Sequence, residues 1–380
     1  MKEITYDELK ALPKDSYELI DIRDEGFTLY GMIPGAIHIF IDEIENSEKL
    51  ADIPAEKKLI FYCEIGRSSR EIDDTLEIFE GRDCYSLSGG YVGFVRSANK
   101  SGGDKEEKRK RAEESIQKKF HKKIFSPFAK ACKTYKLIEE GDRIAVCISG
   151  GKDSMLMAKL FQEIKRHRQV EFELTFLVMD PGYNKENREL IESNAEALGI
   201  PITIFESTIF DAVDTIDKNP CYLCARMRRG YLYSHAKELG CNKIALGHHY
   251  DDVIETILMG MIYGAQIQTM MPKLHSTNFE DMELIRPLYL VREADICAWR
   301  DYNELHFLQC ACHFTDTCTT CHEDGTTSSK RLETKKLIAE LKKTNPYIET
   351  NIFNSVSNVH LDTVIEYKKD GVRHNFLDEY

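Results

Sequence analysis

The stretch that constrains this chain most is Ser149-Gly150-Gly151-Lys152-Asp153-Ser154, a glycine-containing loop between two regular elements. Residues 143–148 before it are apolar and rich in β-branched side chains, which predicts a buried strand. Residues 155–161 after it have the pattern of a helix. A strand that breaks at paired glycines and opens a helix presents backbone N–H groups to an anion. The stretch therefore predicts a phosphate-binding loop.

The side chains of this loop refine the prediction. Ser149 and Ser154 supply hydroxyl donors, and Lys152 supplies a cation. Asp153 does not suit a site that binds phosphate alone, because a carboxylate repels phosphate. It fits if it holds a metal ion or orients a reacting group. The spacing differs from that of the Walker loop, Gly-x-x-x-x-Gly-Lys-Ser/Thr. The alternative is an ordinary strand-to-helix turn.

Length and composition limit the possible classes of protein. A chain of 380 residues is long enough for two or more domains. No apolar run reaches the roughly 18 residues of a membrane span, and the N-terminus lacks the apolar region of a signal peptide, so we expect a cytoplasmic protein without membrane contact. Twelve cysteines in such a chain predict metal or redox chemistry rather than disulfides. The net charge of −13 argues mildly against nucleic-acid binding, although a local basic surface remains compatible with it.

The first predicted domain covers residues 1–96 and contains a candidate nucleophile. The apolar run at residues 59–62 predicts a strand, and it stops at Cys63. The following loop opens a helical pattern, so its N–H groups converge near the cysteine. Such donors favour a thiolate or a persulfide anion, which makes Cys63 a candidate catalytic sulfur carrier. The alternative is that Cys63 is a small buried apolar residue.

Several motifs in this segment together resemble the rhodanese-like domains. The shared motifs are Asp21-Ile22-Arg23, Gly31-Met32-Ile33-Pro34-Gly35-Ala36, the Cys63 loop and the Gly89-Gly90 pair. The resemblance implies a rhodanese-like α/β fold and sulfur transfer through Cys63. The family usually has an arginine five places after the cysteine, where this chain has Ser68. Arg67 and Arg70 flank that position and are the candidates to replace it.

Residues 97–123 form a predicted charged linker. Residues 104–119 are almost wholly charged, with only Ala112 and Ile116 apolar. A helix of this polarity has no apolar face to pack, so we expect a solvated connector or a surface for a charged partner. The preceding Ser101-Gly102-Gly103 predicts a flexible hinge.

The second predicted domain covers residues 124–380 and has an α/β pattern. Apolar strands at 174–180, 202–206 and 243–246 alternate with helical patterns, which predicts a parallel sheet. Ligands of such sheets bind beyond the carboxyl ends of the strands. The phosphate loop, Asp180 and the stretch Gly247-His248-His249-Tyr250-Asp251-Asp252 all fall at such ends. We expect them to face one cleft, with Asp153 and either Asp251 or Asp252 holding Mg²⁺ on a triphosphate. We interpret the two histidines as core or supporting groups.

Two groups of cysteines have metal-ligand spacing. Cys221 and Cys224 form a Cys-x-x-Cys pair, and a later group consists of Cys310, Cys312, Cys318 and Cys321. Two chemistries compete. The later group could close a structural zinc site on its own. Alternatively, the pair recruits one later cysteine to hold an iron–sulfur cluster, which leaves one iron open to carry sulfide. Cys132, Cys147, Cys241 and Cys297 lie in apolar or helical patterns, which predicts core roles.

Four segments of the second domain together resemble the tRNA 2-thiocytidine biosynthesis family of ATP pyrophosphatase-loop tRNA thiolases. They are the loop Ser149–Ser154, Cys221-x-x-Cys224 with the following Arg228-Arg229-Gly230, residues 247–256 and the segment from Cys310 onward. The resemblance implies an adenine-nucleotide α-hydrolase-like fold in which residues 149–154 and Asp180 bind ATP with Mg²⁺. It also implies a [4Fe-4S] cluster on Cys221, Cys224 and one later cysteine, for which Cys310 is the first choice and Cys312 the next.

The function implied is ATP-dependent thiolation of a tRNA base at a carbonyl, with C2 of cytidine as the expected position. Asp153 and Asp251 are the expected catalytic carboxylates, and Cys63 would pass on sulfur from a cysteine desulfurase or another donor. Basic clusters at residues 226–229 and 330–343 are candidates to contact tRNA. A homodimer is left open. The alternatives are a lysidine-type tRNA ligase and a sulfur or redox sensor that binds nucleotide and cluster.

Overall fold

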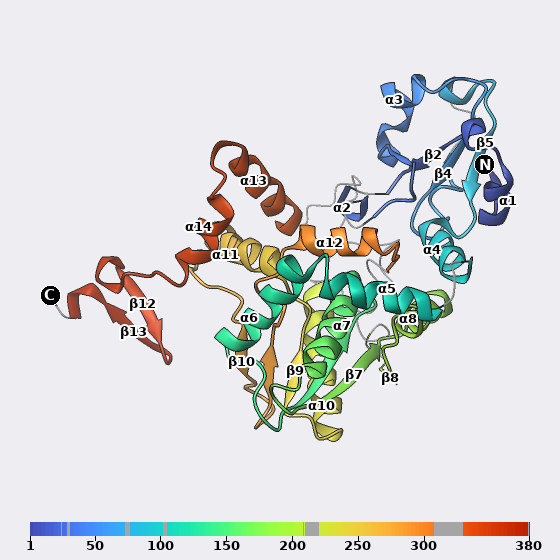
Figure 1. Ribbon diagram of the computed structural model, residues 1–380. Coiled ribbons are helices and arrows are strands. Elements are labelled where there is room, and N and C mark those ends of the chain that lie inside the picture. The colour runs from blue at the N-terminus through green and yellow to red at the C-terminus, as the bar shows by residue number, and fades with distance from the viewer. Residues whose placement is uncertain are drawn as a thin grey trace. The chain divides into compact units, whose positions relative to one another are not determined.

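The computed structural model describes residues 1–23, 25–28, 31–72, 77–101, 105–207, 209, 220–307, 330–378 and 380. Contacts divide the chain into two compact units. The first comprises residues 1–250 and 272–328, and the second comprises residues 251–271 and 329–380. Figure 1 shows the elements with their labels. Among the described helices, none is long and apolar enough to cross a membrane.

The N-terminal part of the first unit is a parallel five-stranded sheet with the order β1-β5-β4-β2-β3. Its elements are β1 (Lys2–Ile4), α1 (Tyr6–Ala11), β2 (Tyr17–Asp21), α2 (Glu25–Thr28), β3 (Ile37–His38), α3 (Glu48–Ala51), β4 (Lys58–Tyr62), β5 (Cys84–Leu87) and α4 (Gly90–Ser101). The central strand β4 is apolar without alternation because both of its faces are buried, as is usual in parallel sheets. This sheet confirms the α/β class expected for the segment.

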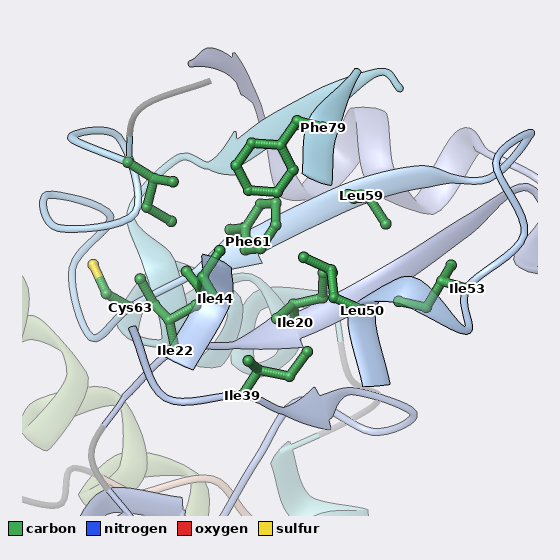
Figure 2. Close-up of a cluster of buried hydrophobic side chains, with 11 residues drawn as sticks. Ile20, Ile22, Ile39, Ile44, Leu50, Ile53, Leu59, Phe61, Cys63 and Phe79 are labelled. Carbon is green, nitrogen blue, oxygen red and sulfur yellow. The ribbon is translucent and has the colours of Figure 1, made fainter. Parts of the chain in front are cut away.

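Figure 2 shows the hydrophobic core of this sheet. Ile20 and Leu59 are fully buried in it, and the rings of Phe61 and Phe79 meet edge to face with centroids 5.5 Å apart. Cys63 follows directly after β4 and belongs to the same cluster. The core therefore fixes the end of β4 and, with it, the position of the cysteine.

The second sheet of the first unit has six strands in the order β10-β11-β9-β6-β7-β8. Every pairing is parallel except that of β10 with β11. The strands are β6 (Arg143–Ile148), β7 (Glu173–Asp180), β8 (Ile202–Glu206), β9 (Lys243–Ala245), β10 (Lys273–His275) and β11 (Glu283–Ile285). The four strands expected from the apolar runs are thus present, and the parallel α/β architecture is confirmed.

The strand order places a topological switch point at β6. The chain proceeds from β6 to β7 and β8 on one side and later returns to place β9 on the other side of β6. Crossover connections diverge at such a point and leave a crevice at the carboxyl end of the strand. The phosphate loop follows β6 at this position. The associated helices are α6 (Ser126–Thr134), α7 (Lys152–Arg166), α8 (Lys185–Leu198), α10 (Pro220–Glu238) and α12 (Glu293–Tyr302). The helix α11 (Tyr250–Gly264) belongs, from Asp251 onward, to the second unit.

The helix α5 (Lys105–Gln117) corrects one expectation. The sequence predicts a solvated connector or a surface for a charged partner, but Ala112, Ser115 and Ile116 are buried. Its Glu113 accepts hydrogen bonds from Lys159 of α7 at 2.7 Å and from Arg166 at 2.9 Å. Ion pairs to α7 thus hold α5 in place, a role that a broad apolar face would normally have. Gly102 and Gly103 of the predicted hinge lie outside the described residues.

The second unit contains α13 (Lys330–Thr344), α14 (Ile348–Ser355) and an antiparallel hairpin of β12 (Glu366–Lys369) and β13 (Val372–Asn375). Asp370 and Gly371 connect the two strands and both have positive φ, at 50° and 80°. Two successive residues of this kind form the tight turn whose twist matches that of a hairpin.

Candidate functional site

The phosphate loop has the backbone expected of an anion site. Gly150 has φ of +85°, a conformation that side-chain-bearing residues rarely adopt. Gly151 is the N-cap of α7 and has no side chain to cap the first turn. Ser154 braces the loop, because its Oγ accepts from the Ser149 N–H at 3.1 Å and donates to the Gly151 carbonyl at 3.0 Å. The loop therefore leaves the first N–H groups of α7 without a side-chain cap, as phosphate binding requires.

Asp153 carries a buried carboxylate oxygen with no hydrogen-bond partner. Its Oδ2 accepts from Lys152 Nζ at 3.2 Å, whereas its Oδ1 has no partner among the described residues. His249 Nε2 lies 4.0 Å from Oδ1, which is too far for a hydrogen bond. Proteins hold Mg²⁺ on nucleotides through one or two carboxylates and the phosphates themselves. The orphaned oxygen therefore fits a metal ligand.

The stretch after β9 meets the phosphate loop, as expected from the sheet. A Cβ atom on Gly247 would lie 3.2 Å from the Ser154 amide nitrogen, which is closer than ordinary packing. Glycine at this position therefore allows the two backbones to approach. His249 follows and is 5% exposed. The sequence identified both segments, and their contact results from the adjacency of β9 and β6.

Asp180 lies at the carboxyl end of β7 with a structural role of its own. Its Oδ1 accepts from the N–H groups of Gly182 at 2.9 Å and Tyr183 at 2.7 Å, and its Oδ2 pairs with Arg188 at 3.2 Å. These contacts hold the turn that follows the strand. A contact between Asp180 and nucleotide stays a prediction.

Asp251 and Asp252 lie in the first turn of α11, in the second unit. The Asp252 carboxylate pairs with Arg331 of α13, and Glu255 lies 3.4 Å from the same guanidinium. Asp252 thus has a structural partner within its unit. The catalytic role expected for Asp251 stays a prediction.

The Cys63 loop surrounds a buried sulfur with donors. Cys63 is 5% exposed, and its Sγ accepts from the Gly66 N–H at 3.1 Å and from the Ser69 hydroxyl at 3.6 Å. Ser69 is fully buried and also shares a hydrogen bond of 2.8 Å with Ser86. Sequence analysis missed Ser69, although two serines in succession after the cysteine were a visible signal. The donors suit a sulfur anion.

Glycines close this loop on the start of α4. The N–H groups of Tyr91 and Val92 donate to the carbonyl oxygens of Cys63 at 2.9 Å and Glu64 at 3.0 Å. A Cβ atom on Gly90 would lie only 2.4 Å from the Cys63 carbonyl oxygen, and one on Gly66 would lie 2.9 Å from the Gly89 nitrogen. The Gly89-Gly90 motif is therefore required by close backbone packing around the cysteine.

The arginines expected to serve Cys63 point to other partners. Arg67 and Arg70 are both exposed. Arg67 lies 3.8 Å from Glu71, and Arg70 pairs with Glu3 at 2.6 Å. The described contacts of the sulfur come instead from the Gly66 amide and the Ser69 hydroxyl. The expectation that a flanking arginine replaces the family's arginine is not met in this structure.

The Asp21-Ile22-Arg23 motif forms a buried ion network beside the Cys63 loop. Arg23 donates to Asp21 at 2.7 Å and to Glu64, the residue after Cys63, at 2.9 Å. Burial opposes the charge of Arg23, but its hydrogen bond and charge interaction with Asp21 raise the guanidinium pKa. The guanidinium also lies 4.0 Å from the Tyr91 ring centroid. The motif thus ties the start of the Cys63 loop to the end of β2 and to Tyr91 of α4.

The predicted metal ligands are only partly described. Cys221 and Cys224 lie three positions apart in the first turns of α10. Cys310, Cys312, Cys318 and Cys321 lie outside the described residues. No group of three or more metal-binding side chains occurs within the described ranges. Cys132, Cys147 and Cys241 are buried, as expected for core residues, and burial raises the pKa of Cys147 to about 12.

Comparison with known proteins identifies two families. The model of the PP-loop domain matches residues 114–312, more than half of the chain, and that of the rhodanese-like domain matches residues 5–97. The tRNA-cytidine(32) 2-sulfurtransferase of Syntrophotalea carbinolica is 33% identical over 64% of this chain and 92% of its own length. The enzyme of the same name from Geobacter sulfurreducens is 34% identical over 63% of this chain and 90% of its own length. The U34-tRNA thiolase NcsA of Methanococcus maripaludis, solved with its [4Fe-4S] cluster, aligns with a TM-score of 0.48 at 22% identity, covering 61% of this chain and 76% of that one.

Proposed function

Because this chain belongs to the PP-loop family, within the branch of the tRNA-cytidine 2-sulfurtransferases, and carries a rhodanese-like domain, we propose that it thiolates cytidine at C2 in tRNA. The chain is an ATP-dependent tRNA sulfurtransferase. The base and position are the finer part of the proposal. They rest on its similarity to relatives of that name. We also propose that the reaction takes place in the cytoplasm, where a tRNA substrate occurs.

In the first step, residues 149–154 bind the triphosphate through backbone N–H groups and the Lys152 ammonium. The base carbonyl oxygen attacks the α-phosphorus, and pyrophosphate leaves with the electrons of the broken P–O bond. Asp153 would hold Mg²⁺, which neutralises charge on the phosphates when bound. The observation that carries this proposal is the buried Asp153 Oδ1, which has no hydrogen-bond partner among the residues that the structure describes, in a loop otherwise built from anion-binding groups. Asp251 is the second proposed carboxylate.

In the second step, sulfur replaces the activated oxygen. A sulfur nucleophile attacks C2, the C–O bond breaks, and AMP leaves with the former base oxygen. Cys221, Cys224 and one later cysteine, with Cys310 the first choice, would hold a [4Fe-4S] cluster. Such a cluster supplies an iron with an open position for sulfide. The proposal rests on the thiolate donor set and on the placement of the pair in one turn of α10.

We assign delivery of sulfur to Cys63. It would accept sulfane sulfur from a cysteine desulfurase or another donor as a persulfide. Transfer of that sulfur to the base as a thiocarbonyl sulfur consumes two electrons, which a thiol reductant would supply by becoming a disulfide as the Cys63 thiol is released. The Gly66 amide and the Ser69 hydroxyl, which contact Sγ, would stabilise the anionic sulfur. Fusion to the thiolase raises the effective concentration of the carried sulfur, because the transfer becomes intramolecular.

Mass spectrometry of tRNA nucleosides tests the proposed function. Cells that lack the gene should lose 2-thiocytidine, and the wild-type gene should restore it, whereas a gene encoding Asp153→Asn should not. Loss of lysidine instead would indicate a lysidine-type ligase. An unchanged nucleoside profile would contradict the enzyme and favour a sensor.

A further inference from the structure

Glu293 reaches the phosphate loop from a distant part of the chain. It opens α12 and lies 141 residues from Lys152, yet its Oε1 is 3.2 Å from Lys152 Nζ. The same oxygen is 3.9 Å from His249 Nε2. The Glu293 side chain is 13% exposed and that of Lys152 is 5% exposed. This contact is therefore a largely desolvated one at the proposed nucleotide site.

Glu293 gives Lys152 a second carboxylate partner. Lys152 Nζ lies 3.2 Å from both Asp153 Oδ2 and Glu293 Oε1. Each carboxylate adds negative charge near the loop, which opposes the entry of a triphosphate. A second acceptor also restricts a lysine, whose four-carbon stem is otherwise flexible. The unfavourable charge is therefore accompanied by an orienting contact.

We propose that Glu293 is a positioning residue for Lys152, and this inference rests on the proposed adenylation at this loop. By sharing the ammonium, Glu293 holds it beside the phosphate loop before nucleotide arrives. It also keeps Asp153 from forming an exclusive ion pair with Lys152. The Asp153 carboxylate then retains the negative charge that a divalent cation needs.

If Glu293 had only a structural role, that role would be to stabilise α12 itself. Glu293 is one of two acidic residues in the first turn of α12, where negative charge stabilises a helix. Asp295 is the other, and it pairs with Lys123 at 3.3 Å with 20% side-chain exposure. The two residues share helix, turn and type of ion pair, but only Glu293 contacts Lys152. Asp295→Asn is therefore the matched control.

The test compares full-length wild-type protein, Glu293→Gln and Asp295→Asn. Binding of a fluorescent ATP analogue is measured in EDTA and in Mg²⁺, and AMP formation is measured with tRNA. We expect Glu293→Gln to bind the analogue in EDTA as tightly as wild type or up to about threefold tighter, because one negative charge is gone. We expect its kcat for AMP formation to fall about tenfold or more, because Lys152 is no longer held. Asp295→Asn should match wild type in both measurements.

Three outcomes would overturn the inference. One is a wild-type kcat in Glu293→Gln. Another is a parallel loss of nucleotide binding, kcat and melting temperature, which would indicate a structural role. The third is an equal fall in kcat in Asp295→Asn. If the wild-type protein itself bound the analogue but formed no AMP with tRNA, the proposed function would fail instead, so the two failures are distinguishable.

Discussion

Glu113 and Lys159 form an ion pair in which the lysine is almost fully buried. Lys159 Nζ lies 2.7 Å from Glu113 Oε1, and the Lys159 side chain is 1% exposed. Lys159 also donates to the Leu198 carbonyl at 2.8 Å and to Gln162 at 2.7 Å. This contact joins the highly charged helix α5 to α7.

Glu113→Gln should destabilise the protein by about 2 kcal/mol, because it leaves a buried ammonium without its counter-charge. Glu114→Gln is the control, since Glu114 pairs with Lys118 on the exposed side of the same helix. Urea unfolding of both variants checks the expectation. Equal midpoints for the two variants would show that the buried pair contributes nothing.

The same pair predicts a dependence of stability on pH. Burial raises the pKa of Glu113, but the hydrogen bond and charge of Lys159 outweigh it and lower the pKa below its ordinary 4.5. A lowered carboxyl pKa stabilises the fold above the unfolded value, and this contribution is lost as the pH falls through the folded value. The stability difference between wild type and Glu113→Gln should therefore shrink as the pH falls below 4.5.

Asp153→Asn should reduce AMP formation by about 100-fold or more, because the amide lacks the charge to hold Mg²⁺ on the phosphates. The fold should survive, since the substitution keeps the shape of the side chain. Asp301→Asn is a control at an exposed carboxylate on α12. AMP and pyrophosphate release in the presence of tRNA is the measurement, and a variant that releases both at the wild-type rate would exclude a metal role for Asp153.

Cys63→Ser should lower thiolation with a persulfide donor and spare it with inorganic sulfide, because free sulfide needs no carrier. Cys84→Ser provides the control, since Cys84 packs partly buried against the same core. The rate of 2-thiocytidine formation is measured with each donor. Equal loss with both donors would assign Cys63 a role in folding, and no loss with either would mean a rhodanese-like fold without a role in sulfur transfer.

Cys221→Ala and Cys224→Ala should each abolish the brown colour and the visible absorbance expected of anaerobically purified protein, because a cluster needs both thiolates. Cys132→Ala, at a buried position on α6, should keep the absorbance. Iron and zinc are measured together with the spectrum. Protein that contains only zinc and stays fully active in both variants would contradict the cluster.

Much of the phosphate loop and of the Cys63 loop could be predicted from the sequence. Paired glycines at 150–151 and 89–90 marked positions where the backbone must adopt positive φ or pack closely, and the structure shows such conformations at Gly150 and Gly90. Continuous apolar runs identified β4 and β6 because parallel strands are buried on both faces. These are local properties, so they are encoded by neighbouring residues.

The residues that contact the functional side chains could not be predicted from the sequence. The sequence placed Lys152 and Asp153 in one loop, but only the fold brings Glu293 of α12 to Lys152. Likewise, the arginines beside Cys63 were expected to serve its sulfur, whereas folding directs Arg70 to Glu3 and brings the Ser69 hydroxyl inward. The sequence by itself determined the loops, the strands and the chemistry of their side chains, because backbone conformation and hydrophobic periodicity are local. The tertiary structure alone decided which charges meet, because an ion pair between residues far apart in the chain depends on how whole elements pack.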